Sequence, residues 1–272
     1  RQFPPARFAT LAALMLGVGS AGNLVASYPT ALAVDLFGWR QTLAGLAAIS
    51  VAVAAGIFLT VADPDKPDGE HKGSVFDLLK MPVMWAIFPL MLVAYAPSGA
   101  LRGLWIGPYL NDVYGLSTQQ VGLAATVMGA AMIAGTFAYG PLDRLLGSRK
   151  RVVLSGNLLA CLALGGLILA AGAPVWVPVA MMAAVGFFGA SFPVIMAHGR
   201  AFVPPHLAGR GVTLLNLFGI GGVGIMQFVT GRIHANTAGA DPSLPYTGIF
   251  TFFLVCLGLG CAIYLLSRDS MD

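Results

Sequence analysis

Long stretches without a charged side chain dominate this 272-residue sequence and limit what it can fold into. A helix needs about 20 mostly apolar residues to cross the hydrocarbon core of a bilayer. The segments of that length without Asp, Glu, Lys or Arg are Phe8–Val34, Gln41–Ala62, Met81–Leu101, Val113–Leu142, Gly211–Gly231 and Pro242–Ser267. A further one, Val152–Gly199, is long enough for two spans, with a break predicted at the two prolines of Gly172–Pro178. We therefore predict an all-α polytopic membrane protein with eight transmembrane helices.

The composition argues against the soluble and metal-binding classes. Only 10% of the residues are charged, against roughly 25% in an average soluble domain. The three cysteines lie in apolar segments without metal-ligand spacing, so we expect neither a zinc site nor a disulfide framework. The net charge of +4 is spread over short loops and forms no basic face. The predicted partner is therefore the lipid bilayer and not a nucleic acid, and no metal or catalytic site is predicted.

One polar segment divides the chain. Residues 63–81 hold five of the 11 acidic residues together with Lys66, Lys72 and Lys80, and their prolines and glycines favour a solvated connector. Two predicted spans precede this connector, in residues 1–62, and six follow it, in residues 82–272. We predict these three parts as the tail of one helical domain, a linker and a complete six-helix domain.

The distribution of basic residues predicts the orientation. If the eight spans alternate, 12 of the 15 Lys and Arg residues lie on one side, and only Arg40, Arg102 and Arg232 lie on the other. By the positive-inside rule, both ends of the chain and the linker are then cytoplasmic. The expected location is the plasma membrane, which is the inner membrane in a Gram-negative bacterium.

Two similar segments suggest an internal repeat. Arg1–Pro5 matches Arg200–Pro205 around a Phe and a Pro-Pro pair, and each is followed by three glycines at the same spacing, at 17, 19 and 22 and at 219, 221 and 224. The glycine spacing also matches a dinucleotide-binding motif, but that motif needs a strand before it and an acidic residue after it. Both copies lie inside uncharged spans, so no cofactor is predicted. The glycines are expected to let helices approach closely.

The segment between the fourth and fifth predicted spans resembles the loop motif of the major facilitator superfamily. The matching positions are Gly140, Asp143, Arg144, Arg149, Lys150 and Arg151. The Gly-Trp-Arg sequence that ends at Arg40, the charged linker and the six later spans are also similar to parts of that family. The resemblance runs from the family's fifth helix to its twelfth, and we expect a fragment that lacks the first four. It implies that the basic cluster forms a cytoplasmic gate.

The resemblance implies a secondary transporter that moves a small solute by alternating access. A non-transporting sensor or scaffold with the same fold remains open, as does, with less support, a polytopic membrane enzyme. The enzyme would need clustered His, Asp or Glu near one membrane face, and the sequence shows no such cluster. The sequence leaves open whether a proton or another ion is coupled to transport, because it places no carboxylate at mid-depth in a span.

Polar residues inside spans are the candidates for the solute site, because polarity in hydrocarbon is costly and tends to face a cavity. Arg102 leads, because its planar guanidinium fits an anion, so an anionic solute is the favoured class. The alternative for Arg102 is snorkelling to the outer surface or pairing with Asp112. The other candidates are Asn23, Tyr28, Tyr95, Trp105, Tyr109, Asn216 and Gln227. For these, hydrogen bonds between helices are the alternative. Prolines at 89 and 97 predict that the span before Arg102 is broken, with Arg102 facing inward beside Trp105 or Tyr109.

Overall fold

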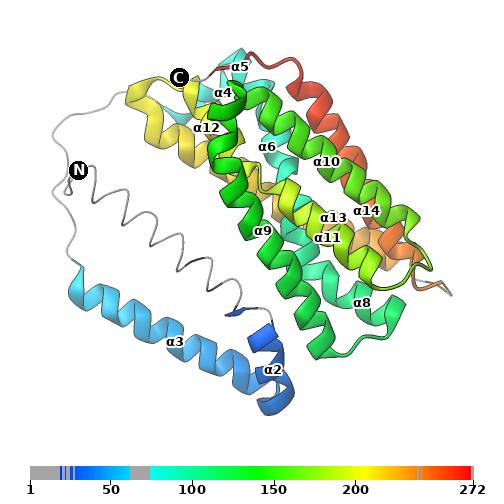
Figure 1. Ribbon diagram of the computed structural model, residues 1–272. Helices are drawn as coiled ribbons and strands as arrows, with labels where there is room; N and C mark the ends of the chain where they lie inside the picture. Colours follow the sequence, from blue (N-terminus) through cyan, green and yellow to red (C-terminus); the bar gives the residue numbers. More distant parts are fainter. Residues whose placement is uncertain are drawn as a thin grey trace.

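The structure is a computed structural model, and every regular element among the residues that it describes is a helix (Figure 1). It describes residues 19, 22, 25–26, 28–61, 74–237, 239 and 241–270, and only the backbone of residues 143 and 144. The helices are α2 (Tyr28–Phe37), α3 (Trp39–Thr60), α4 (Val75–Leu79), α5 (Pro82–Trp85), α6 (Phe88–Ala94), α7 (Ala96–Ala100), η1 (Leu101–Trp105, a π-helix), α8 (Ile106–Tyr114), α9 (Thr118–Leu146), α10 (Arg149–Leu169), α11 (Trp176–Gly189), α12 (Phe192–Ala201), η2 (Pro205–Leu207, a 3₁₀ turn), α13 (Ala208–Thr237) and α14 (Leu244–Tyr264).

Seven runs of helix in the described residues are long and apolar enough to cross a membrane. They are α3, the run from α5 to α8, α9, α10, the pair α11–α12, the pair η2–α13, and α14. The all-α polytopic membrane fold is thereby confirmed. The first predicted span, Phe8–Val34, lies mostly outside the described residues, and α2 is its described end.

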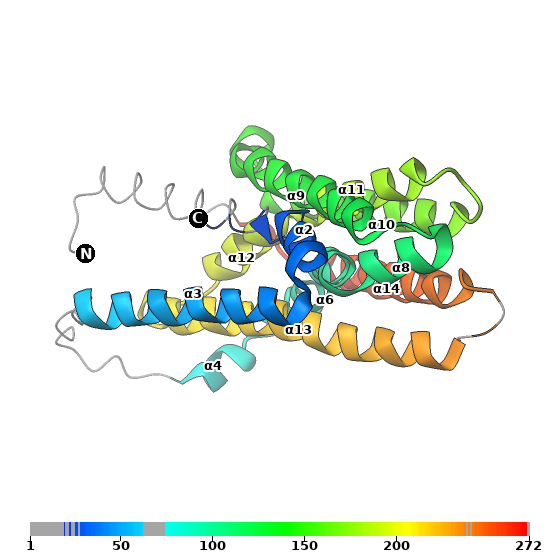
Figure 2. The ribbon, with the colours of Figure 1, turned by 90° about the horizontal axis from the view of Figure 1, so that it is seen from below.

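The last six runs pack together as one bundle, whereas α3 stands apart (Figure 1). None of the residues of α3 is buried, and α3 reaches the bundle through α2, which packs on α9. Figure 2 shows the same bundle from below, with α13 and α14 along one side and α9 and α10 along the other. The buried core of the bundle is rich in aromatic side chains, among them Phe88, Tyr246, Phe250, Phe253 and Tyr264.

Glycines set how closely the helices of the bundle cross. A Cβ built on Gly222 of α13 would lie 1.9 Å from the carbonyl oxygen of Leu92 in α6. A Cβ on Gly135 of α9 would lie 2.4 Å from the carbonyl oxygen of Phe187 in α11. Backbones therefore touch at both crossings, as small residues allow in membrane bundles. In the predicted glycine repeat, Gly219 faces Phe192, while a Cβ on Gly221 or Gly224 would meet nothing within 4 Å. Gly17 lies outside the described residues, so the repeat stays a prediction.

Two spans that the sequence treats as long runs are broken at mid-length. The run before Arg102 is interrupted at Ala86–Ile87 and at Tyr95, and Pro89 and Pro97 lie in the first turns of the helices that follow. The last span of Val152–Gly199 is interrupted at Ala190–Ser191, with Pro193 in the first turn of α12. The turn predicted between Gly172 and Pro178 is present as well. Proline is accommodated at these positions because its missing N–H has no partner in a first turn.

The end of the predicted connector is structured. Ser74 and Asp77 form a capping box that starts α4, with the Ser74 N–H donating to the Asp77 carboxylate at 2.8 Å. Leu78 is fully buried, and α4 packs on α13. Residues 75–79 of the predicted connector are thus helical, with Ser74 and Asp77 exposed to solvent and Leu78 buried, and the division into two domains and a linker stays a prediction. Residues 62–73 lie outside the described residues.

Candidate functional site

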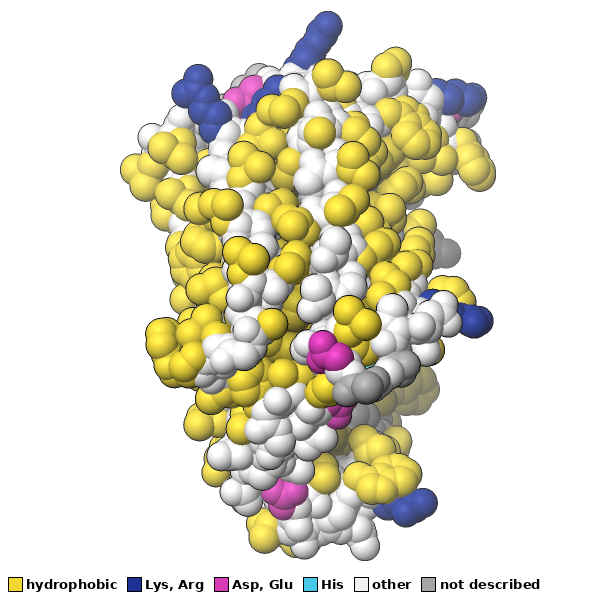
Figure 3. Space-filling model, turned by 90° about the vertical axis from the view of Figure 1, so that its right-hand side faces the viewer, with side chains coloured by type: hydrophobic (Ala, Val, Ile, Leu, Met, Phe, Trp, Pro, Cys, Tyr) yellow, Lys and Arg dark blue, Asp and Glu magenta, His cyan; other side chains and the backbone are white. Residues whose placement is uncertain are grey.

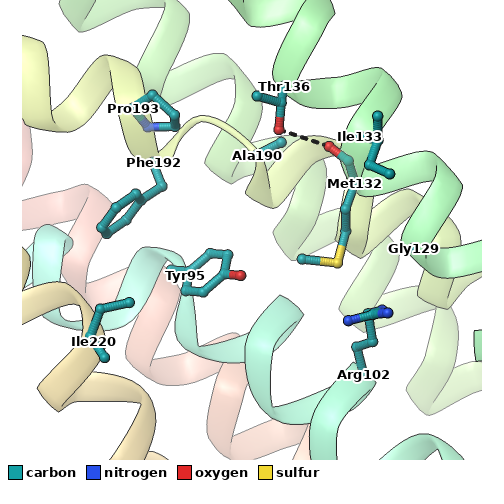
Figure 4. A pocket seen from close by; sticks show the side chains of 10 residues that line it. All are labelled: Tyr95, Arg102, Gly129, Met132, Ile133, Thr136, Ala190, Phe192, Pro193 and Ile220. Carbon is teal, nitrogen blue, oxygen red and sulfur yellow. Dashed lines mark hydrogen bonds between the residues drawn. The ribbon is translucent and has the colours of Figure 1, made fainter. Parts of the chain in front are cut away.

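A cavity of about 280 Å³ opens in the bundle between α9, α13 and the two broken spans (Figure 4). Its lining residues are Tyr95, Arg102, Gly129, Met132, Ile133, Thr136, Ala190, Phe192, Pro193 and Ile220. We call this the Arg102 cavity. Both helix breaks lie in its wall: Tyr95 separates α6 from α7, and Ala190 and Phe192 flank the break between α11 and α12. Irregular backbone at membrane depth is tolerated where it is buried in protein or lines a wet cavity.

Among the described residues of this lining, Arg102 is the one that carries a charge. Its side chain is half-buried, and its Nε atom is fully buried. A Cβ built on Gly129 would lie only 3.1 Å from that Nε atom, so glycine at this position lets the guanidinium lie directly against α9. Figure 4 shows the head of Arg102 beside Gly129 at the edge of the cavity. The arrangement places a permanent positive charge at the wall of a hollow within the bundle.

The rest of the lining is mainly apolar. Tyr95 contacts Phe192 with ring centroids 5.3 Å apart, and its hydroxyl points into the cavity (Figure 4). The Thr136 hydroxyl donates to the backbone carbonyl of Met132 at 2.9 Å. The remaining side chains offer hydrocarbon or sulfur surfaces. The cavity therefore combines one cation and one tyrosine hydroxyl with apolar walls.

Arg102 also lines a second hollow, of about 420 Å³, on the side of α2. Thr30, Ala31 and Val34 of α2 form one wall, and η1, α8 and α9 form the others. The backbone N–H of Tyr28 donates to the Thr126 hydroxyl of α9 at 3.1 Å, which fixes the start of α2 on the bundle. Arg102 thus lies between the six-helix bundle and the helices that precede the linker.

The π-helical turn η1 explains why Arg102 does not share its face with the two aromatic residues expected beside it. In an α-helix, Arg102, Trp105 and Tyr109 would lie on one side. The wider turn of Leu101–Trp105 shifts the later residues around the axis. Trp105 instead donates from Nε1 to the Thr230 hydroxyl at 2.9 Å and stacks on His234. The prediction that Trp105 or Tyr109 lines the cavity with Arg102 is therefore corrected.

Trp105 and Tyr109 belong to an aromatic cluster around Tyr246. The Tyr109 ring meets the Tyr246 ring edge-on at 5.1 Å, and Trp105 lies 6.2 Å from it. The Tyr246 hydroxyl donates to the carboxylate of Asp112. Asp112, which the sequence offered as a partner for Arg102, is thus engaged by α14. The cluster joins α8, α13 and α14 at the end of the bundle opposite the C-terminus.

None of the other described candidates is among the residues that line the two hollows. Tyr28 is exposed on α2, and Asn216 is exposed on α13. Gln227 is half-buried, with its Nε2 atom 3.9 Å from a Cβ built on Gly103. Asn23 lies outside the described residues. Of the eight predicted cavity residues, the structure brings Arg102 and Tyr95 together.

The predicted gate loop is largely helical. Gly140, Asp143 and Arg144 lie within α9, which continues to Leu146, and α10 begins at Arg149. Gly147 ends α9 with φ of +59°, a conformation that favours glycine, and the Ser148 hydroxyl caps α10 by accepting from the Arg151 N–H at 3.1 Å. The expectation of a loop over residues 140–151 is therefore wrong, because one Gly and one Ser suffice to turn the chain.

The basic residues after this turn hold the end of the chain. Lys150 donates from Nζ to the carbonyl oxygens of Leu265 and Ser267 at 2.7 and 2.6 Å, and its N–H donates to Asp269 at 3.1 Å. The Ser148 hydroxyl also donates to Asp269, and Arg149 reaches the Ser270 carbonyl at 3.4 Å. We call this contact of residues 265–270 with Ser148–Lys150 the tail clasp. The sequence did not identify Ser148 or Asp269 as a pair, since 121 residues separate them.

His198 completes the tail clasp from α12. Its ring is fully buried, with Nε2 2.9 Å from the Arg268 carbonyl oxygen and Nδ1 2.5 Å from the Tyr264 hydroxyl. Because a carbonyl oxygen only accepts, Nε2 carries the proton, and Nδ1 accepts from Tyr264. Burial raises the pKa of the Asp269 carboxyl, but hydrogen bonds from Ser148 and Lys150 outweigh it and hold that pKa below its usual range.

The described residues contain no group of three or more His, Cys, Asp or Glu that could hold a metal ion. No Asp, Glu or His of the described chain lines either hollow around Arg102. The described residues that line the two hollows offer the Arg102 guanidinium, hydroxyl groups and apolar surfaces.

One comparison with known proteins bears on this arrangement. A family model described as the Major Facilitator Superfamily matches residues 93–271. The match covers well over half of the chain and includes the Arg102 cavity and the tail clasp.

Proposed function

The chain belongs to the major facilitator superfamily, a family of transporters, and we propose that it serves in moving a small organic anion across the membrane by alternating access. The observation that supports this substrate class is the position of Arg102. Within the part of the chain that the structure describes, it is the one charged side chain that lines the cavity of about 280 Å³, where two broken helices end. That volume is at the lower end of the range for small-molecule pockets, so the solute is small.

The energetics support a binding role for Arg102. A charged residue at the centre of a bilayer costs about 2.5–3.5 kcal/mol on insertion scales, so intramembrane charges mark functional sites. A guanidinium offers planar, bidentate hydrogen bonds to a carboxylate or phosphate. The apolar walls formed by Met132, Ile133 and Phe192 favour an anion with a hydrocarbon body over an inorganic anion.

We further propose that the end of the bundle carrying the tail clasp faces the cytoplasm of the plasma membrane. Lys and Arg side chains gather at the upper end of the face in Figure 3, and hydrophobic side chains cover much of its length. The excess of basic residues in the loops at this end supports the orientation. The bundle and the helices before the linker would then rock about the Arg102 cavity.

Uptake of a panel of small carboxylates by the intact protein in proteoliposomes tests this function. Arg102→Lys should keep the fold and lower uptake about tenfold, because Lys keeps the charge but loses the planar fork. Arg232→Lys is the matched control, because Arg232 is exposed and lies over the Phe228 ring outside both hollows. Unchanged uptake by Arg102→Lys and Arg102→Ala would contradict the proposal. Binding without uptake would indicate the sensor or scaffold alternative.

A further inference from the structure

A second basic hollow lies at the tail-clasp end of the bundle, away from the Arg102 cavity. It has a volume of about 510 Å³ and is lined by Arg149, Arg200, Ala197, Ala201, Val203, Pro205 and Ala208. We call it the Arg200 hollow. Two arginines form its polar side, and the other five residues form an apolar floor. No acidic residue of the described chain belongs to the lining.

The Arg200 hollow lies at the level where three spans leave the hydrocarbon. Arg149 is the first residue of one candidate span, Ala201 is the last of another, and Pro205 is the first of a third. The hollow therefore spans the boundary between acyl chains and headgroups. A phospholipid at this level would bring its phosphate to the two arginines and an acyl chain to the apolar floor.

The two arginines have different surroundings. Arg149 takes part in the tail clasp, where its Nη1 donates to the Ser270 carbonyl oxygen. The carboxylate of the neighbouring Asp269 accepts hydrogen bonds from the Lys150 N–H and the Ser148 hydroxyl. Arg200 is exposed in the last turn of α12, and the described residues provide it with no ion pair. The C-terminal end of α12, where the helix dipole is negative, lines the hollow and reduces the positive potential there, whereas Asp269 is not among the lining residues. Arg200 is therefore the residue whose charge is available to a ligand.

We propose that the Arg200 hollow binds the phosphodiester headgroup of an anionic phospholipid, with an acyl chain against Ala197, Ala201 and Val203. Basic pockets between transmembrane helices on the cytoplasmic side suit such headgroups. This assignment does not depend on the solute proposed for the Arg102 cavity. It adds a lipid that would sit against α12 and the start of α13, the two elements joined by η2.

Native mass spectrometry of the intact protein, with added phosphatidylglycerol or phosphatidylcholine of the same acyl chains, tests the proposal. Phosphatidylglycerol should be retained in preference to phosphatidylcholine. Arg200→Ala should weaken its retention about fivefold, the effect of one basic residue near an anionic surface. Arg200→Lys should retain most of the binding, because a headgroup phosphate accepts a point charge.

Arg210→Ala is the matched control. Arg210 is exposed near the start of α13, two residues beyond Ala208, and it does not line the hollow. Equal loss in Arg210→Ala and Arg200→Ala would overturn the proposal, because it would indicate diffuse attraction to a basic surface. Equal retention of the two lipids would also overturn it. Displacement of phosphatidylglycerol by millimolar inorganic phosphate would show a free-anion site instead of a lipid site.

Discussion

The Arg102 cavity and the tail clasp use buried polar groups in opposite ways. In the tail clasp, Ser148, Lys150 and His198 each direct their polar atoms at defined atoms of residues 264–269. In the Arg102 cavity, the guanidinium and the Tyr95 hydroxyl lie at the wall of a hollow with apolar surroundings (Figure 4). The clasp closes three helices around one segment of backbone. The cavity leaves room for a molecule.

This difference suggests how to distinguish polar side chains that stabilise a membrane bundle from polar side chains that bind a solute. Polar groups that satisfy one another fix a single arrangement of helices. A charge beside a cavity costs free energy that a bound solute can offset. Substitutions in the tail clasp should therefore change stability and leave solute binding intact, and substitutions at the cavity should do the reverse.

The largest effect is expected for His198→Ala. This change removes one buried and one partly buried hydrogen bond and leaves the Tyr264 hydroxyl and the Arg268 carbonyl without His198 as a partner. The free energy of unfolding should therefore fall by about 2–3 kcal/mol. Thermal unfolding in detergent measures it. His206→Ala is the control, because His206 is exposed on η2. If His198→Ala instead abolished solute binding at unchanged stability, the division between clasp and cavity would fail.

A smaller effect, confined to solute binding, is expected for Gly129→Ala. The new methyl group would lie 3.1 Å from Arg102 Nε and push the guanidinium off α9, so affinity for the anion should fall about fivefold. Gly140→Ala is the matched control on the same helix, because a Cβ there meets nothing within 4 Å. Equal affinities of the two variants in a binding assay would show that the position of Arg102 against α9 does not matter.

The smallest effect is the pH dependence of the tail clasp. Because the folded-state pKa of Asp269 is lowered, its contribution is present above the unfolded-state pKa of about 3.9 and is lost as pH falls through the folded-state value. Asp269→Asn should cost about 0.5–1 kcal/mol at neutral pH, as for an exposed helix cap, and this cost should shrink as the pH falls toward the folded-state pKa. Melting curves of both proteins between pH 7 and pH 3 compare them. A difference that grows on acidification would contradict this sign.

Sequence patterns were sufficient to predict that the protein spans a membrane and where most spans lie. Both predictions depend on local features, namely the length of uncharged segments and the positions of prolines. They also located Arg102, since a charge within an apolar run is conspicuous. Three features escaped them. The π-turn that separates Arg102 from Trp105 has no composition signal, and the pairing of Ser148 with Asp269 depends on the packing of α10 against α14. The break at Ala190–Ser191 had a signal in Gly189 and Pro193, which a search for long spans overlooks.

The central claim, that Arg102 selects an anion, is tested most directly by matched probes of equal shape. Benzoate, benzamide and benzylamine present an anionic, a neutral and a cationic group on the same ring. Binding to the intact protein, measured by calorimetry, should favour benzoate, and Arg102→Ala should weaken that binding by about ten- to a hundredfold, the range for a hydrogen-bonded charge. Equal binding of the three probes, or benzoate binding that survives Arg102→Ala unchanged, would contradict the account.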